Sequence, residues 1–117
     1  MLPHDHEFAA LKEKLLTMSS LAASSVRKAV KALVERNDDL ARQVESDDDK
    51  LDQLEIELDE LCIVLLSRGP IATDLRMITV AMKITHDLER VGDEATTIAR
   101  RAIDLNKESQ LKPYVDM

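Results

Sequence analysis

The sequence predicts an all-α protein, an antiparallel three-helix bundle with long helices. The 117 residues include only 2 Gly and 3 Pro, and aromatic residues make up 2% of the chain. That composition is typical of long helices rather than of a sheet. Apolar residues recur at steps of three or four over most of the chain, which is the period of a helix face. Two strong breaks, at 37–39 and 69–70, divide the pattern into three helices.

The first helix is expected from about Glu7 to Arg36, after a disordered N-terminal tail at residues 1–6. Its middle, Ser19 to Ser25, consists almost entirely of small residues. This run favours close helix packing, or it leaves space for ions and water beside acidic side chains of the next helix. The helix carries one apolar stripe, formed by Phe8, Leu11, Leu15, Met18, Ala22, Val26, Ala29 and Leu33.

The second helix is expected from about Asp39 to Ser67, with the short polar side chains of residues 37–39 able to cap its start. Its core seam is Leu40, Val44, Leu51, Leu54, Leu58, Leu61 and Leu65, with an acid in the slot near residue 47. Beside this seam runs a second stripe, formed by Asp48, Asp52, Glu55 and Asp59. Because it borders the core, this acidic stripe is not simply a solvated face. Cys62 continues the stripe as an inert small hydrophobe.

The third helix is expected to begin at Ile71 or Asp74, after Gly69-Pro70, and to end near Asn106. Its stripe of Leu75, Ile78, Met82 and Thr85 continues into Glu89, Gly92/Asp93 and Thr96. Gly92 costs about 1 kcal/mol relative to Ala inside a helix, which suggests that another group approaches the backbone there. The three helices would form one domain over residues 7–107, followed by a C-terminal tail at 108–117.

Two carboxylate pairs with four-residue spacing point to a metal site. Asp48 and Asp52 share one helix face, as do Glu89 and Asp93. If the chain folds back at 70/71, residues whose numbers add to 141 lie level, which pairs Asp48 with Asp93 and Asp52 with Glu89. Four carboxylates near a core repel strongly unless a cation lies among them. Oxygen ligands suit divalent magnesium and manganese, and bridging carboxylates also suit iron.

Net charge and cysteine content restrict the compartment and the binding partners that we expect for this protein. The net charge of −7 argues against nonspecific binding to nucleic acid or anionic lipid. The single Cys62 cannot form an intramolecular disulfide, which fits a reducing compartment. No signal peptide is visible, and the longest aliphatic run, Ile63 to Leu66, is too short to enter a bilayer as a span. We therefore expect a cytoplasmic protein without direct membrane insertion.

Residues 44–102 resemble the PhoU family of phosphate-signalling proteins. The turn sequence Pro70-Ile71-Ala72-Thr73-Asp74-Leu75-Arg76 and the segment Asp87-Leu88-Glu89-Arg90-Val91-Gly92-Asp93 carry the resemblance, and residues 15–18 and 29–33 match more loosely. It implies tandem three-helix bundles that bind iron, zinc or other metal ions, here through Asp48, Asp52, Glu89 and Asp93. It also implies action with the Pst phosphate ABC transporter and a sensor histidine kinase, to repress phosphate-starvation genes.

One feature departs from that family, because this chain holds a single three-helix unit. Either it is a fragment of a longer protein, with 108–117 as a truncated linker to a second repeat, or two copies assemble. The unit should expose a surface that the family normally covers, so we expect a homo-oligomer.

Two other functions compete with a metal-binding regulator. The acids could be merely solvated on a metal-independent helical scaffold. A di-iron carboxylate oxidase would need Glu-x-x-His on two helices of a four-helix bundle, but Lys83 precedes His86 and Pro3 precedes His6 at that spacing. No nucleophile–base pair is present, so we expect no enzyme. His86 is level with Glu55, either as an accessory metal ligand or as its ion-pair partner.

Overall fold

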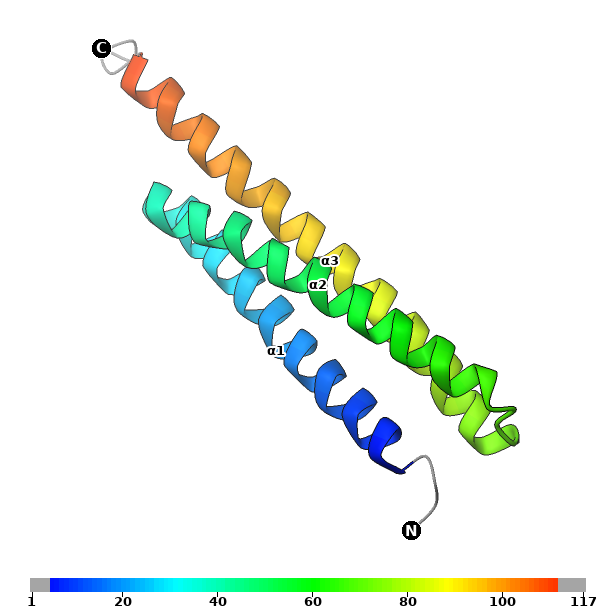
Figure 1. Ribbon diagram of the computed structural model, residues 1–117. Helices are drawn as coiled ribbons and strands as arrows, with labels where there is room; N and C mark the ends of the chain where they lie inside the picture. The colour runs from blue at the N-terminus through cyan, green and yellow to red at the C-terminus, as the bar shows by residue number, and fades with distance from the viewer. Residues whose placement is uncertain (1–4, 112–117) are drawn as a thin grey trace.

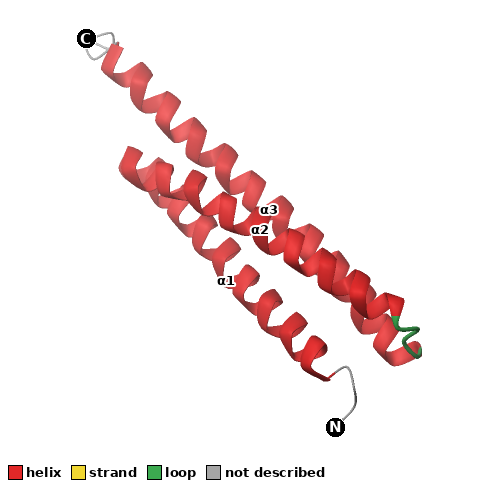
Figure 2. Ribbon diagram, in the orientation of Figure 1, coloured by secondary structure: helices red, strands yellow, loops and turns green. Residues whose placement is uncertain are grey.

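The computed structural model describes residues 5–111, which form a rod of three helices (Figure 1). Helix α1 spans Asp5–Glu35, α2 spans Asp38–Ser67 and α3 spans Ala72–Leu111. Successive helices run antiparallel, each helix contacts both others, and the rod measures 70 × 18 × 16 Å. Across the described part of the chain there is no strand (Figure 2). The prediction of an all-α three-helix bundle is confirmed.

The helix bounds differ from the predicted ones at the two ends of the chain. Helix α1 begins at Asp5, two residues before the predicted start, and α3 continues to Leu111, beyond Asn106. The prediction of a tail from residue 108 is therefore wrong for 108–111. The first residue that cannot continue a helix is Pro113, so nothing in the sequence stops α3 at Asn106. Residues 1–4 and 112–117, which hold the rest of both predicted tails, lie outside the described residues.

The first break is built by Arg36 and Asn37. Arg36 has a φ of 54°, in the left-handed region, and the backbone N–H of Asn37 donates to the carbonyl of Ala32 at 2.9 Å. This is the pattern that ends many helices. The Asn37 side chain then accepts a hydrogen bond from the N–H of Leu40 at 3.0 Å, which caps α2. One short segment thus ends α1 and starts α2, as the sequence predicts.

The second break depends on Gly69. Its φ of 62° is in the left-handed region, which glycine occupies without the steric cost that other residues incur. The N–H groups of Arg68 and Gly69 donate to the carbonyls of Leu65 and Leu66, which completes the end of α2. Helix α3 begins as the N–H of Leu75 donates to the carbonyl of Ile71 at 2.8 Å.

The core consists of two clusters along the rod. The turn-end cluster, near the α2–α3 turn, is Leu11, Met18, Ala22, Leu51, Leu58, Cys62, Leu65, Ile78 and Ala81. The alanine cluster, towards the other end, is Ala29, Ala32, Ala41, Val44, Ala95, Ala99 and Ala102. Small side chains in the alanine cluster allow the helices to approach closely. The acidic residues predicted to bind metal lie at the junction of the two clusters.

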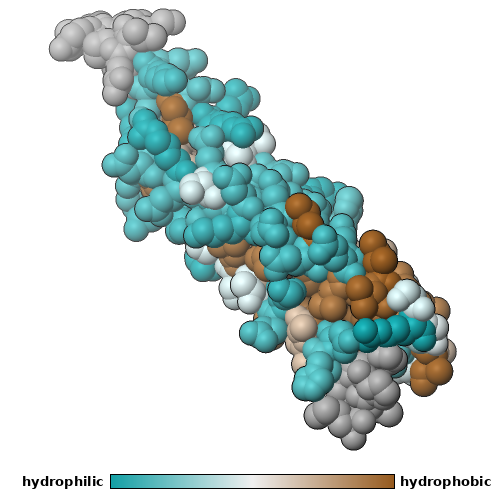
Figure 3. All heavy atoms as spheres, in the orientation of Figure 1, coloured by the Kyte–Doolittle hydropathy of each residue, from teal (hydrophilic) through white to brown (hydrophobic). Residues whose placement is uncertain are grey.

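Several apolar residues of the predicted stripes lie on the surface instead. Leu33 on α1 and Leu75 and Met82 on α3 are each about two-fifths exposed. On α3, Ile78 and Ala81 are the residues that face the core at this level. Brown apolar atoms gather towards the α2–α3 turn (Figure 3). The large exposed apolar side chains of α2 and of the first half of α3 are Ile56, Ile63, Val64, Ile71, Leu75, Met77, Val80, Met82 and Ile84.

Replacing Leu58 with Ala should lower the free energy of unfolding by about 2–5 kcal/mol, because it opens a cavity in the turn-end cluster. Leu58 is fully buried, whereas Ile63 on the same helix is 63% exposed. The matched change Ile63→Ala should cost less than about 1 kcal/mol. Urea denaturation followed by circular dichroism measures both, and equal losses would contradict this assignment of the core.

Candidate metal centre

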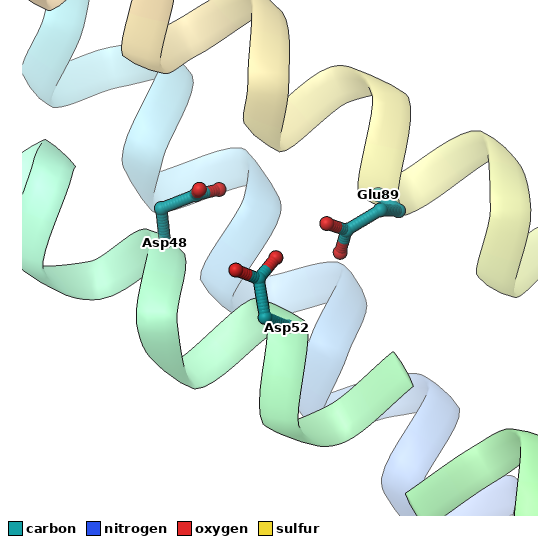
Figure 4. A group of neighbouring side chains, drawn as sticks. All are labelled: Asp48, Asp52 and Glu89. Atoms are coloured by element: carbon teal, nitrogen blue, oxygen red, sulfur yellow. The ribbon is translucent and has the colours of Figure 1, made fainter. Parts of the chain in front are cut away.

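Three carboxylates from two helices converge at the junction of the core clusters. Asp48 and Asp52 lie one turn apart on α2, and Glu89 faces them from α3 (Figure 4). Each offers one oxygen atom, and these three atoms all lie within 4.8 Å of one another. Such oxygens are close enough to share one cation at the distances of 2.0–2.6 Å that oxygen ligands typically adopt.

Each helix contributes an inner and an outer acid. Asp48 and Glu89 are half-buried, and both lie three residues before a buried residue, Leu51 or Gly92. The second acid of each pair follows four residues later, which rotates it about 40° further from the interior. Asp52 and Asp93 are accordingly exposed.

Asp93 does not join the close group of three oxygens, although the sequence predicts it as a fourth ligand. Its charge nevertheless reaches the group, since repulsion from Asp93 contributes to raised pKa values at both Asp48 and Glu89. The structure therefore places Asp93 as a neighbour of the other three acids, on the solvent side.

The inner acids hold oxygen atoms without a partner. Asp48 Oδ1 and Glu89 Oε2 are both buried and accept no hydrogen bond. Among the described residues, no ion pair involves Asp48, Asp52, Glu89 or Asp93. Buried polar atoms are otherwise nearly always satisfied. A cation between these carboxylates would satisfy both oxygens, so the donor set fits a metal ion that prefers oxygen.

Burial and mutual repulsion change the protonation of the inner acids. The pKa of Glu89 is raised to about 8, first by burial, then by a hydrogen bond with Asp52 and by repulsion from Glu55, Asp52 and Asp93. The pKa of Asp48 is also raised, first by burial and then by repulsion from Asp52 and Asp93, while Arg100 partly opposes the shift. Without a cation, the raised pKa of Glu89 favours a proton bound among these acids at neutral pH.

Glu55 and His86 lie beside the three acids in an open hollow of about 370 Å³, which Asp59, Lys83 and Thr85 also line. Burial raises the pKa of Glu55, as does repulsion from Asp59 and Asp52, while the charge of His86 lowers it. His86 is exposed and stands outside the group of three oxygens. Its electrostatic effect on Glu55 agrees with their predicted level position.

At Gly92, the backbone of α3 lies close to side chains of α2. A Cβ atom at this position would lie 2.6 Å from Leu51 Cδ1 and 3.3 Å from Asp48 Oδ1. The first distance is too short for a real contact, so an alanine would displace the fully buried Leu51. The expectation that another group approaches the backbone at Gly92 is met by Leu51 and by a carboxylate of the centre.

Sequence reasoning missed the ion pairs that connect α1 to α2. Asp47 is 8% exposed, and Lys28 Nζ lies 2.9 Å from its Oδ2. Lys14 Nζ pairs with Glu57 Oε1 at 2.7 Å. The sequence does show an acid, Asp47, at a position of α2 where the apolar pattern predicts a core residue. The spacing of residues does not identify its partner on α1, Lys28.

Residues 15–102 match the family model described as the PhoU domain. The chain belongs to the PhoU family. A phosphate-specific transport system accessory protein PhoU homolog from Aquifex aeolicus is 44% identical over 112 residues, which cover 95% of this chain and 51% of that protein. The Escherichia coli protein named phosphate-specific transport system accessory protein PhoU is 31% identical over 99 residues, which cover 84% of this chain and 41% of that protein.

The fold agrees with a solved PhoU structure. The crystal structure of PhoU from Pseudomonas aeruginosa aligns with a TM-score of 0.87 and 42% sequence identity, over 90% of this chain and 51% of that one. The chain thus spans about half the length of the PhoU proteins it matches. The resemblance seen in the turn sequence and in the segment from Asp87 to Asp93 is confirmed at the level of the family.

We expect the metal-free protein to lose stability as pH rises from about 4.5 to about 8. Folding raises the pKa of Glu89 from 4.5 in the free side chain to about 8. The folded state then binds more protons, so the free energy of unfolding falls across this interval. Urea denaturation in the presence of EDTA measures the profile.

The variant Glu89→Gln should flatten that profile, because it removes the titrating group. Glu94→Gln serves as its control, since Glu94 is exposed on the same helix and should leave the slope unchanged. A wild-type profile that is level between pH 5 and 8 would contradict the proposed protonation of Glu89.

Proposed function

We propose that this chain is a non-enzymatic regulator of phosphate uptake that binds metal ions through Asp48, Asp52, Glu89 and Asp93. The observation that carries the proposal is the set of three carboxylate oxygens within 4.8 Å, two of whose side chains also hold buried, unpartnered oxygens. A group with this much uncompensated negative charge is costly in a folded protein. Binding a cation is the chemistry that offsets the cost.

The ligand chemistry favours hard cations. All three close ligands are carboxylates, which suit Mg²⁺, Mn²⁺ and iron, and Zn²⁺ also accepts carboxylate oxygen. Asp93, exposed one turn beyond Glu89, would complete the set by a change of side-chain rotamer. The centre is then partly open to solvent, through the outer acids Asp52 and Asp93, and a bound ion could exchange there.

Metal binding would act on the shape of the bundle as well as on its charge. Asp48 and Asp52 belong to α2, whereas Glu89 and Asp93 belong to α3. A shared cation therefore joins two helices across the junction of the core clusters and replaces repulsion with attraction. We infer that the metal-loaded form presents a different surface to partner proteins.

The proposed partners are a phosphate ABC transporter and a sensor histidine kinase. Two of the relatives described above are named as accessory proteins of a phosphate-specific transport system, which supports the transporter. The kinase follows from the resemblance to PhoU-like regulators alone. Within residues 5–111, no helix is both long and apolar enough to cross a membrane. We propose that contact with the transporter is made through protein surfaces on the cytoplasmic side.

Adding Mn²⁺, Fe³⁺, Zn²⁺ or Mg²⁺ should stabilise the protein. A free ion about 100-fold above its dissociation constant adds about 3 kcal/mol to the free energy of unfolding. Thermal denaturation after EDTA treatment and dialysis, with each ion added back, measures the gain. The double variant Asp52→Asn with Glu89→Gln should remove it.

The matched control is Glu60→Gln with Glu94→Gln, which replaces one carboxyl group with an amide on each of the same two helices, at exposed positions. It should keep the metal-dependent gain. If the Asp52/Glu89 variant keeps the wild-type response to all four ions, the acids form only a solvated surface and the proposed metal function fails.

We also predict self-association of the chain. The exposed apolar side chains near the α2–α3 turn include Ile63, Ile71 and Val80, each at least half exposed. Apolar atoms that gather on one part of a surface, as they do near this turn (Figure 3), are typical of an interface. Native mass spectrometry at mild ionic strength should show at least a dimer and reports the metal content in the same measurement. A strict monomer at high micromolar concentration in sedimentation velocity would contradict the prediction.

A further inference from the structure

Helix α1 also reaches the junction where the acids meet, through Ser25. On α1, Ser25 lies between Ala22 of the turn-end cluster and Ala29 of the alanine cluster. On α2, the same junction falls within residues 44–51, the stretch that contains Asp48. The two ion pairs that connect α1 and α2 fix an antiparallel register that puts Ser25 within about one helical turn of Asp48. In Figure 4 the pale blue ribbon of α1 passes behind the aspartates of α2.

The Ser25 hydroxyl is buried and has no partner. Ser25 is 1% exposed, and its Oγ makes no hydrogen bond. The buried threonines of α3 behave differently: Thr85 donates to the carbonyl of Ala81 at 2.8 Å, and Thr96 donates to that of Gly92 at 3.0 Å. A hydroxyl on a helix can usually satisfy itself in this way. Ser25 does not, so its donor remains available to a neighbouring group.

Three buried side-chain atoms lack a partner among the described residues, and all three lie at this junction. They are Ser25 Oγ, Asp48 Oδ1 and Glu89 Oε2. One is a donor and two are acceptors, each from a different helix. Unsatisfied buried groups cost free energy wherever they occur, so their coincidence at one junction is not explained by close packing of small residues.

We propose that Ser25 is a positioning residue of the metal centre, whose hydroxyl donates to Asp48 Oδ1 through one buried water molecule. A water needs at least two polar partners to be held inside a protein, and these two atoms supply them. This hydrogen bond would fix the orientation of the Asp48 carboxylate relative to Asp52 and Glu89. This proposal rests on the proposed metal function for its consequence, but the contact itself exists without metal.

The contact is tested first without metal, by a double-mutant cycle. Ser25→Ala, Asp48→Ala and the combined variant are compared by urea denaturation in EDTA. If the hydroxyl holds Asp48, removing it destabilises the wild type but not the Asp48→Ala background. The two changes should be non-additive by about twofold or more in the equilibrium constant of unfolding. Additivity overturns the proposal, whether or not the protein binds metal.

Metal affinity is the second readout, measured by isothermal titration with Mn²⁺ alone. Groups that orient a ligand typically change affinity by roughly 10- to 100-fold, so Ser25→Ala should weaken binding at least tenfold. Ser25→Thr keeps the hydroxyl but overpacks a buried site, so it should lower stability while keeping the wild-type affinity. If Ser25 has only a packing role, Ser25→Thr should weaken Mn²⁺ binding more than Ser25→Ala does.

The matched control is Ser20→Ala, an exposed serine from the same run of small residues. This variant should change neither the free energy of unfolding nor the affinity for Mn²⁺. Wild-type binding of Mn²⁺ with unchanged affinity in Ser25→Ala overturns the role of Ser25 and leaves the metal function intact. Absence of any binding by the wild type defeats the metal function, and with it the role of Ser25 at the centre.

Discussion

The main constraint on this bundle is repulsion among carboxylates that no basic side chain of the described residues neutralises. Asp48, Asp52 and Glu89 meet where two apolar core clusters join, and no basic side chain among the described residues pairs with them. Desolvation and mutual repulsion both favour their protonated forms, which is why the pKa of Glu89 rises to about 8. Replacing these acids with apolar residues would stabilise such a bundle. Under the function proposed above, a cation bound among these acids would turn the repulsion into binding energy.

The basic side chains of the bundle lie around this centre rather than in it. Lys28 pairs with Asp47, a buried residue directly before Asp48. Arg100 pairs with Glu45 at 3.6 Å. Exposed pairs contribute little to stability, but the buried Asp47 must keep its partner, because an unpaired buried charge is costly. The α1–α2 pair therefore helps to fix the register that brings the junction residues level. Helix α1 has a structural role at the centre even before Ser25 is considered.

Sequence reasoning recovered the fold because its signals are local. The helix period, the cap at Asn37 and the left-handed Gly69 each act within a few residues, so three antiparallel helices followed directly. The end of α3 was misplaced because no residue before Pro113 breaks a helix. The centre was recovered in part: level pairing brought Asp48, Asp52 and Glu89 together, but it treated Asp93 as equivalent to them. Matching residues whose numbers add to 141 places them at the same height but ignores rotation around the helix axis. Each four-residue step adds about 40° of rotation, which decides which acid of a pair faces inward.

That rotation also explains how the centre could respond to its surroundings. The inner acids, Asp48 and Glu89, each hold a buried oxygen without a partner, and the outer acids, Asp52 and Asp93, remain exposed. An ion can thus enter from the solvent side and contact both classes of ligand. A proton on Glu89 competes with it, so affinity should rise with pH until that proton is lost. Because the proposed ligands come from α2 and α3, occupancy would be coupled to the packing of the two helices at Gly92, where a single Cβ would already collide with Leu51. Such tight packing limits gradual adjustment, so an ion that changed the spacing of α2 and α3 would require the side chains around Leu51 to repack.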